Sequence, residues 1–275
     1  MEYRVLSDGL RLPVIGLGTY KAENCADTVS RAIEYGYRMF DTAEMYRNEA
    51  EVGRGIRASG VSREEVVIVT KLSHKSYDRA DEAVRGCLER LQTDYIDLML
   101  LHWPFGNYYA AWRTLEDFRA KGVIRSVGVS NFEPAGLIDL INYNETPPSV
   151  DQIETHLWCQ RKDCRRWMDK YHVAHMGYAP LGHGAKNHML ELPAVQGLAR
   201  KYGVTGAQIC LKFQIKEGVI VIPKTSRPER LKENIDLFGF DLTDEETELL
   251  RALDKDEPFI GTPGLPEKAE AALLW

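Results

Sequence analysis

Four side chains whose chemistry suits proton transfer lie within the first 102 residues: Asp41, Tyr46, Lys71 and His102. A single Asp, Lys or His is more often a helix cap, a surface charge or a buried imidazole with a partner than a catalytic group. Here, however, three of them end consecutive apolar segments. A buried ammonium beside a carboxylate and a phenol favours the phenolate, so we expect Lys71 to lower the pKa of Tyr46. Tyr46 is then a candidate general acid.

Short apolar segments that alternate with helical segments must position these residues. The segments expected to be strands are residues 14–18, 38–42, 66–71, 96–102, 124–129, 149–153, 173–178 and 218–222. This alternation is typical of parallel βαβ units, and eight strands suit a closed (β/α)8 TIM barrel, although a doubly wound sheet gives a similar alternation. Because the carboxyl ends of barrel strands meet at one mouth, Asp41, Lys71 and His102 are expected to converge there.

The remaining elements fit the same α/β architecture. Asp8-Gly9 between two apolar stretches predicts an N-terminal β-hairpin. The patterns Ser226-x-x-Glu229 and Thr243-x-x-Glu246 predict capping boxes, the second of them on an extra C-terminal helix. A length of 275 residues suits one barrel, and no linker, repeat or low-complexity tract divides the chain, so we expect a single domain over residues 1–275.

Composition disfavours several classes of partner. With 35 Lys plus Arg against 41 Asp plus Glu, the net charge of -6 is unsuited to nucleic acid or an anionic membrane surface. The five cysteines have no CxxC spacing and fit reduced thiols, and no segment has the length of a signal-peptide core or a membrane span. We therefore expect a cytoplasmic protein that binds neither nucleic acid nor membrane, with no metal.

Two motifs could bind phosphate. The segment Gly53–Ala58 matches the dinucleotide fingerprint as a string, but it lies inside an expected helix rather than at a strand-to-helix turn, so a Rossmann dehydrogenase is disfavoured. Basic and hydroxyl side chains gather instead where the last strand meets the next helix: Lys224, Ser226, Arg227 and Arg230. Free N–H groups and the helix dipole attract an anion at such a place.

The order of these motifs resembles that of the aldo-keto reductases. The main matching segments are Phe40-Asp41-Thr42-Ala43-x-x-Tyr46-x-Asn48-Glu49, Thr70-Lys71-Leu72 and Leu101-His102-Trp103-Pro104, with Gly16–Thr19, Ser126–Phe132, Gln152–Glu154, Tyr178–Gly182 and Ile222–Ser226 around them. They follow the family's order over roughly residues 3 to 254. The short loops are similar to those of the compact microbial 2,5-diketo-D-gluconate reductases.

The resemblance implies a (β/α)8 barrel that uses NADP(H) to reduce aldehydes or ketones, such as small carbonyls or keto sugars, to alcohols. It also implies that Tyr46 donates the proton, that Lys71 and Asp41 tune Tyr46, and that His102 orients the carbonyl oxygen. The residues that it implies for the cofactor are Gly18, Thr19, Ser130, Asn131 and Gln152, the ring-stacking Tyr178, Leu181, the phosphate-binding Lys224, Thr225, Ser226 and Arg230, and Glu233 and Asn234 near the adenine. Those that it implies for the substrate pocket are Tyr20, Trp103 and Phe105.

The chain departs from the family pattern after His156, where Leu157-Trp158-Cys159 stands in place of the usual proline, so we expect an altered loop after the sixth strand. Two other functions stay open. One is a cofactor-binding regulatory subunit with the reductase fold and little turnover, which the complete set of four residues disfavours. The other is a phosphate-handling barrel enzyme. In each case we expect a monomer.

Overall fold

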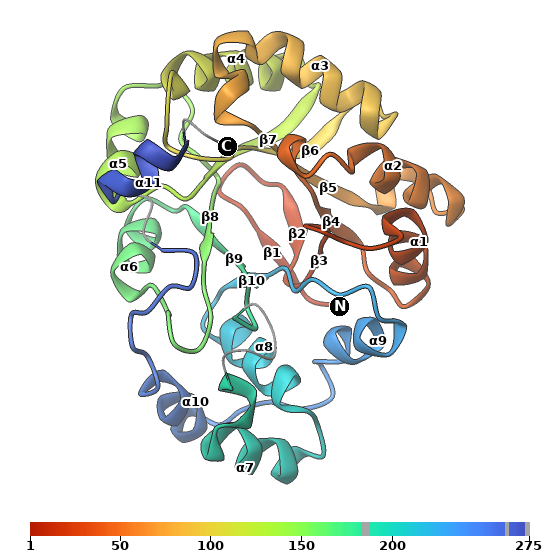
Figure 1. Ribbon diagram of the computed structural model, residues 1–275, viewed down its shortest axis with the longest axis vertical. Coiled ribbons are helices and arrows are strands. Elements are labelled where there is room, and N and C mark those ends of the chain that lie inside the picture. Colours follow the sequence, from red (N-terminus) through yellow and green to blue (C-terminus); the bar gives the residue numbers. More distant parts are fainter. Residues whose placement is uncertain (183–187, 262–263, 273–275) are drawn as a thin grey trace.

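Eight parallel strands form the centre of the protein in a computed structural model that describes residues 1–182, 188–261 and 264–272 (Figure 1). In chain order they are β3 (Leu17–Gly18), β4 (Met39–Asp41), β5 (Val67–Leu72), β6 (Ile96–Leu101), β7 (Ile124–Ser130), β8 (Val150–Glu154), β9 (Ala174–Tyr178) and β10 (Ile220–Val221). Each strand pairs with its neighbours in sequence, so the sheet order runs from β3 to β10. The strands lie where the alternation of apolar and helical segments predicts them.

The sheet closes on itself between its first and last strands. Ile15 forms a parallel bridge with Val221, and the Gly18 N–H donates a hydrogen bond to the Pro223 carbonyl oxygen (3.1 Å). A Cβ atom on Gly18 would lie 2.9 Å from the Ile222 carbonyl oxygen, so this close approach of two backbones requires glycine. The fold is therefore the predicted (β/α)8 barrel, and the doubly wound alternative is wrong.

The N-terminal hairpin closes one end of the barrel. As predicted, β1 (Tyr3–Val5) pairs antiparallel with β2 (Arg11–Pro13), and Gly9 in the turn adopts a φ of 90°, which favours glycine. Leu6 and Leu12 from the hairpin are buried in the same apolar cluster as the inward-facing residues of the barrel strands. The hairpin lies behind the strands in Figure 1, so the view looks into the open end, where the strands have their carboxyl ends.

Helices surround the barrel, and most of them bury an apolar face in its core. They are α1 (Cys25–Glu34), α2 (Glu49–Ala58), α3 (Ala80–Leu91), α4 (Tyr108–Ala120), α5 (Pro134–Asn142), α6 (Lys162–Lys170), α7 (Pro193–Tyr202), α8 (Gly206–Lys216) and α9 (Pro228–Ile235), followed by α10 (Asp244–Arg251) and α11 (Pro266–Ala272). Single 3-10 turns are η1 (Glu44–Tyr46), η2 (Arg63–Glu65), η3 (His74–Arg79) and η4 (Met189–Glu191). Over the described ranges, no helix has both the length and the apolar character needed to cross a membrane.

The two predicted capping boxes have different outcomes. At α10 the Thr243 hydroxyl accepts from the Glu246 N–H (3.3 Å), and the Glu246 carboxylate accepts from the Thr243 N–H (2.8 Å), which confirms that box. The box predicted at Ser226 is wrong, because α9 begins only at Pro228, whose fixed φ suits the first helical turn. The Ser226 hydroxyl instead accepts a hydrogen bond from the Glu23 N–H (3.1 Å) and ties this loop to the segment before α1.

Candidate active site

A buried ion pair joins the carboxyl ends of β4 and β5. Lys71 Nζ lies 2.6 Å from Asp41 Oδ1 and donates a second hydrogen bond to the Thr42 carbonyl oxygen (2.9 Å). Lys71 is fully buried and Asp41 is 2% exposed. Burial lowers the pKa of Lys71, and the Asp41 carboxylate opposes this effect. The two charges therefore depend on each other, since neither is solvated by water.

Tyr46 lies beside this ion pair, at the end of η1. The centroid of its ring is 5.0 Å from Lys71 Nζ and 5.7 Å from that of the His102 ring. Burial raises the pKa of Tyr46 well above its ordinary value, and the Asp41 carboxylate raises it further. The expectation that Lys71 lowers this pKa is therefore wrong: Asp41 offsets the ammonium charge, so the cost of burying a phenolate dominates. Tyr46 holds its proton at neutral pH.

His102 follows β6 and completes the group of four. It is 7% exposed, and its Nδ1 atom has no hydrogen-bond partner among the described residues. Burial lowers the pKa of His102 well below 6.5, and the nearby Lys71 and His74 lower it further. The imidazole is therefore neutral at pH 7 and carries one N–H donor. Asp41, Tyr46, Lys71 and His102 thus meet at the mouth of the barrel, as the places of Asp41, Lys71 and His102 at strand ends predict.

Hydrogen bonds connect the ends of β7, β8 and β9 to the ion pair. Gln152 Nε2 donates to Asp41 Oδ2 (2.7 Å), the carboxylate oxygen on the far side from the ammonium. The Ser130 hydroxyl donates to the Gln152 carbonyl oxygen (2.8 Å), and the Tyr178 hydroxyl donates to Asn131 Oδ1 (2.8 Å). Asn131 also has a φ of 64°, a left-handed conformation that asparagine tolerates better than most residues. The residues implied for the nicotinamide therefore form one hydrogen-bonded group, in which Gln152 is the member that contacts Asp41.

Aromatic rings extend from His102 along one side of the mouth. The Trp103 ring stacks on the His102 ring with centroids 6.0 Å apart, and the Phe105 ring stacks on Trp103 at 5.9 Å. Tyr20 is 48% exposed and lies 4.9 Å from the Tyr46 ring. These three residues, implied for the substrate pocket, therefore flank the group of four and offer an apolar surface next to Tyr46 and His102.

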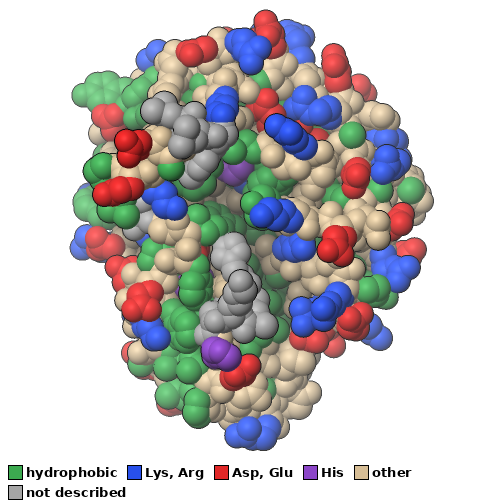
Figure 2. Space-filling view, viewed as in Figure 1, with side chains coloured by type: hydrophobic (Ala, Val, Ile, Leu, Met, Phe, Trp, Pro, Cys, Tyr) green, Lys and Arg blue, Asp and Glu red, His purple; other side chains and the backbone are tan. Residues whose placement is uncertain are grey.

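Basic side chains gather on the rim beside β10 and α9. Lys224, Arg227 and Arg230 are exposed, and within the described part of the chain none of them pairs with a carboxylate. Thr225 is buried between them, and its hydroxyl accepts from the Arg227 N–H (3.1 Å). Lys and Arg side chains are frequent on the corresponding side of the molecular face in Figure 2, over α1 and α9. An anion is expected to bind here.

The other residues implied for the cofactor have structural partners of their own. The Thr19 N–H and hydroxyl both donate to the backbone carbonyl at the end of β4 (2.9 Å each). Glu233 accepts a hydrogen bond from the hydroxyl that caps α8 (2.7 Å), Asn234 is 4% exposed, and Leu181 packs against the apolar core. Gly18 allows the barrel to close. A contact between these residues and a cofactor stays a prediction.

Two residues that were not singled out from the sequence hold the turn that carries Tyr46. Asn48 accepts a hydrogen bond from the Thr42 hydroxyl (2.8 Å), and the Glu44 carboxylate accepts from the Ser73 N–H after β5 (2.8 Å). Each lies two residues from Tyr46. A one-turn 3-10 helix is too short to show a periodic apolar pattern. Only the position of Glu44 and Asn48 within the Asp41-to-Glu49 motif could have indicated their role.

Known proteins are similar to this chain over most of its length. A sequence model of the Aldo/keto reductase family matches residues 14–255. The chain belongs to the aldo/keto reductase family. This reductase is 38% identical over 254 residues to the methylglyoxal reductase DkgA of Yersinia pestis, a match that covers 90% of this chain and 91% of that protein. It is 36% identical over 270 residues to 2,5-diketo-D-gluconic acid reductase B of Corynebacterium sp. (strain SHS752001), with 96% and 97% covered. The resemblance to the diketogluconate reductases is thereby confirmed.

Solved structures of relatives have the same barrel. An aldo-keto reductase enzyme from a Medee basin deep-sea metagenome library superposes with a TM-score of 0.93 at 34% identity, and the match covers 96% of this chain and 98% of that one. The Bombyx mori aldo-keto reductase in complex with NADP superposes with a TM-score of 0.88 at 32% identity, with 93% and 94% covered. The reductase thus belongs to an oxidoreductase family whose fold extends over nearly the whole chain.

Proposed function

We propose that this reductase transfers hydride from NADPH to small aldehydes or ketones, with Tyr46 as the proton donor. The observation that carries the proposal is the position of the Tyr46 ring, 5.0 Å from the ammonium of Lys71 and 5.7 Å from the His102 ring, beside an ion pair of 2.6 Å. Buried charges are expensive, and apolar residues of similar size would pack the mouth of a barrel as well. A functional reason for this group is therefore the better explanation.

Reduction of a carbonyl group places negative charge on its oxygen, and donors must stabilise that charge. NADPH, when bound, would supply the hydride that adds to the carbonyl carbon. The Tyr46 hydroxyl then gives its proton to the oxygen, and the Lys71 ammonium stabilises the phenolate that remains until water returns a proton. The neutral His102 ring donates a hydrogen bond to the same oxygen and orients it. The product is the alcohol.

The side chains at the mouth and on the rim fit a nicotinamide dinucleotide phosphate. The exposed cations Lys224, Arg227 and Arg230 suit the phosphate groups, and amide and hydroxyl groups at the ends of β7 and β8 suit a carboxamide. The proposed contacts are Ser130, Asn131 and Gln152 to the carboxamide, Tyr178 to the ring, Lys224, Thr225, Ser226 and Arg230 to the 2'-phosphate, and Glu233 and Asn234 near the adenine, with Gly18, Thr19 and Leu181 along the groove. The NADP complex of the Bombyx mori relative supports this choice of cofactor.

The substrates that we propose are small carbonyl compounds, including ketoaldehydes and keto sugars. Relatives named methylglyoxal reductase and 2,5-diketo-D-gluconic acid reductase support this class. The aromatic wall of Trp103 and Phe105 and the exposed ring of Tyr20 would contact the carbon chain of the substrate, while its carbonyl oxygen reaches Tyr46. We also propose that the enzyme is a monomer with a single domain.

Steady-state oxidation of NADPH with a panel of carbonyls tests the function. Methylglyoxal and small aldehydes should be reduced with saturation kinetics, and NADH should have a higher KM than NADPH, because it lacks the phosphate that the rim cations bind. Tight NADPH binding without turnover on any carbonyl would favour the regulatory-subunit alternative instead. Turnover that requires a phosphorylated substrate would favour the phosphate-handling alternative.

A further inference from the structure

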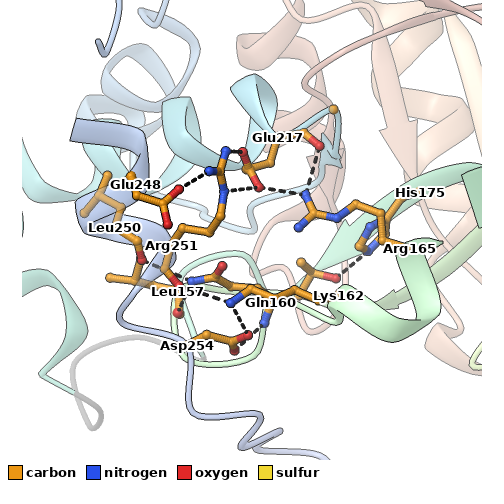
Figure 3. Close-up of polar contacts among 12 residues, drawn as sticks. Leu157, Gln160, Lys162, Arg165, His175, Glu217, Glu248, Leu250, Arg251 and Asp254 are labelled. Atoms are coloured by element: carbon orange, nitrogen blue, oxygen red, sulfur yellow. Dashed lines mark hydrogen bonds and ion pairs between the residues drawn. The ribbon is translucent and has the colours of Figure 1, made fainter. Parts of the chain in front are cut away.

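The chain between α10 and α11 lies along the loop that follows β8. Residues 254–261, here called the strap, run antiparallel to residues 154–162, here called the β8 loop. At the outer end, Asp254 Oδ1 accepts a hydrogen bond from the Gln160 N–H (3.1 Å), and Lys162 Nζ lies 3.1 Å from Asp254 Oδ2. Figure 3 shows these groups facing one another below the end of α10. The strap therefore begins at a fixed point.

The middle of the strap follows the part of the β8 loop that is expected from the sequence to differ from the family pattern. His156 and Cys159 exchange two backbone hydrogen bonds (3.0 and 2.9 Å), so residues 156–159 form a tight turn. The Trp158 carbonyl oxygen accepts from the Lys255 N–H (3.0 Å) and from a second strap N–H, that of Glu257 (3.1 Å). Lys255 Nζ also lies 3.9 Å from the centroid of the Trp158 ring. The β8 loop thus provides a surface on which the strap lies.

The inner end of the strap is held by Glu154, the last residue of β8. One carboxylate oxygen of Glu154 accepts from the Phe259 N–H (2.7 Å), and the other accepts from the Ile260 N–H (2.9 Å). The Glu154 side chain is 3% exposed, and His156 Nε2 lies 3.3 Å from it. Burial raises the pKa of Glu154, but hydrogen bonds from His156 and the two N–H groups outweigh it, and the pKa lies below its ordinary value. An undocked strap would leave a buried carboxylate short of donors, so this contact favours docking strongly.

The inner end of the strap lies at the carboxyl end of β8, on the rim of the barrel mouth. Glu154 pairs in register with Tyr178, the residue proposed to face the nicotinamide ring. Beyond the strap, α11 ends with the Ala272 carbonyl oxygen accepting from His74 Nε2 (3.0 Å), in the segment after β5. The His74 ring in turn lies 6.1 Å from Phe105 in the aromatic wall. Described parts of the C-terminal chain therefore contact both the end of β8, through Glu154, and the segment after β5, through His74 next to the proposed substrate pocket.

We propose that Glu154 is a positioning residue for substrate specificity. By binding two consecutive backbone N–H groups of the strap, it fixes Phe259 and Ile260 at the end of β8 and thereby the shape of the pocket that larger carbonyl substrates enter. The effect on specificity rests on the proposed function. The anchoring of the strap does not, and it can be measured separately.

Two measurements on the full-length protein test this role in Glu154→Ala and in the milder Glu154→Gln, which keeps one carbonyl acceptor. Amide hydrogen exchange of peptides that cover residues 255–261 reports docking of the strap. KM and kcat for methylglyoxal and for the larger 4-nitrobenzaldehyde, at saturating NADPH, report specificity. Asp97→Asn is a matched control: Asp97 is 1% exposed and also accepts a backbone N–H, that of Ile68 (2.9 Å), but it lies at the amino end of β6.

In Glu154→Ala, strap amides should exchange about tenfold faster or more, because each lost hydrogen bond to a charged acceptor shifts docking by that order. KM for 4-nitrobenzaldehyde should rise about tenfold, while KM for methylglyoxal, kcat and NADPH affinity change less than about threefold. In Glu154→Gln, the exchange rates and KM values should lie between those of the wild type and those of Glu154→Ala, and Asp97→Asn should lower thermal stability without changing either KM.

Wild-type exchange in both Glu154 variants would refute the anchoring. Equal changes of both KM values, or the same changes in Asp97→Asn, would refute the role in specificity. A wild type without turnover would refute the proposed function, and with it the specificity, while the exchange data still decide the anchoring.

Discussion

Replacement of Asp41 by asparagine should destabilise the reductase far more than loss of an exposed ion pair. The Asp41→Asn variant removes the charge that lies 2.6 Å from Lys71 Nζ, in a pair whose side chains are 3% and 0% exposed. The ammonium then keeps only the Thr42 carbonyl oxygen and an uncharged amide. Removing one partner of a buried pair costs about 3–5 kcal/mol. The unfolding entropy of about 2.1 cal/mol/K per residue gives roughly 0.6 kcal/mol/K for 275 residues, so Tm should fall by about 5–9 °C.

This shift in Tm can be measured by monitoring thermal unfolding with circular dichroism, and two further variants serve as controls. Asp81→Asn breaks an ion pair of similar length, 2.7 Å, whose side chains are 62% and 55% exposed, so it should lower Tm far less than Asp41→Asn does, because water screens exposed charges. The double variant Asp41→Asn with Lys71→Met removes both buried charges, and it should be more stable than Asp41→Asn alone.

The pH dependence supplies an independent check. In Asp41→Asn the pKa of Lys71 falls further, because the carboxylate that opposes the effect of burial is gone. The destabilisation caused by the unpaired Lys71 charge is complete below the pKa of Lys71 in the folded protein. It disappears as pH rises toward the pKa of Lys71 in the unfolded chain. The Tm deficit of Asp41→Asn should therefore shrink between pH 7 and pH 9.5. A deficit no larger than that of Asp81→Asn, or a double variant less stable than the single one, would refute the assignment of a charged, mutually dependent pair.

Three other outcomes follow from the geometry. Because burial keeps His102 neutral, kcat/KM for carbonyl reduction should show no inflection near pH 6.5; a limb there that is lost in His102→Gln would show that the histidine titrates. Burial raises the pKa of Asp151 well above its ordinary value, so this carboxyl stays protonated in the folded protein at a pH where the unfolded chain, with a pKa of about 3.9, ionises it. The wild type should therefore lose stability between pH 4 and pH 7, and the Tm of Asp151→Asn relative to wild type should rise over this range. A constant difference in Tm would argue against a protonated Asp151. Arg230→Ala should weaken NADPH binding about tenfold or more while leaving NADH binding nearly unchanged in titrations of cofactor fluorescence; equal losses for both would place Arg230 away from the 2'-phosphate.

The barrel and the meeting of the four residues were predictable because both depend on local patterns. Apolar segments between helical segments can be recognised from apolar runs and turn residues, and barrel topology then brings the strand ends together. Asp41, Lys71 and His102 are all at or next to such ends, so their convergence needed no knowledge of side-chain contacts. The hairpin around Gly9 and the cap at Thr243 are equally local.

What the sequence did not predict depends on burial and on contacts between distant segments. The direction of the Tyr46 pKa shift follows from desolvation, which a list of charged neighbours does not contain. The Gln152 contact with Asp41 and the Glu154 contacts with the strap join segments about a hundred residues apart, and no periodicity reports them. Ser226 matched a capping pattern, but a proline two residues later moved the helix start, and its hydroxyl took another partner.

The most direct test of proton donation by Tyr46 is a single-turnover measurement with NADPH bound before a carbonyl is added. Tyr46→Phe removes only the hydroxyl, so the rate of NADPH oxidation should fall about a hundredfold or more while the dissociation constant for NADPH stays within about twofold of wild type. Tyr20→Phe removes the neighbouring hydroxyl at the same mouth, 4.9 Å away between ring centroids, and should retain nearly the full rate. A Tyr46→Phe enzyme that reduces the carbonyl at the wild-type rate would contradict the central claim that this phenol supplies the proton.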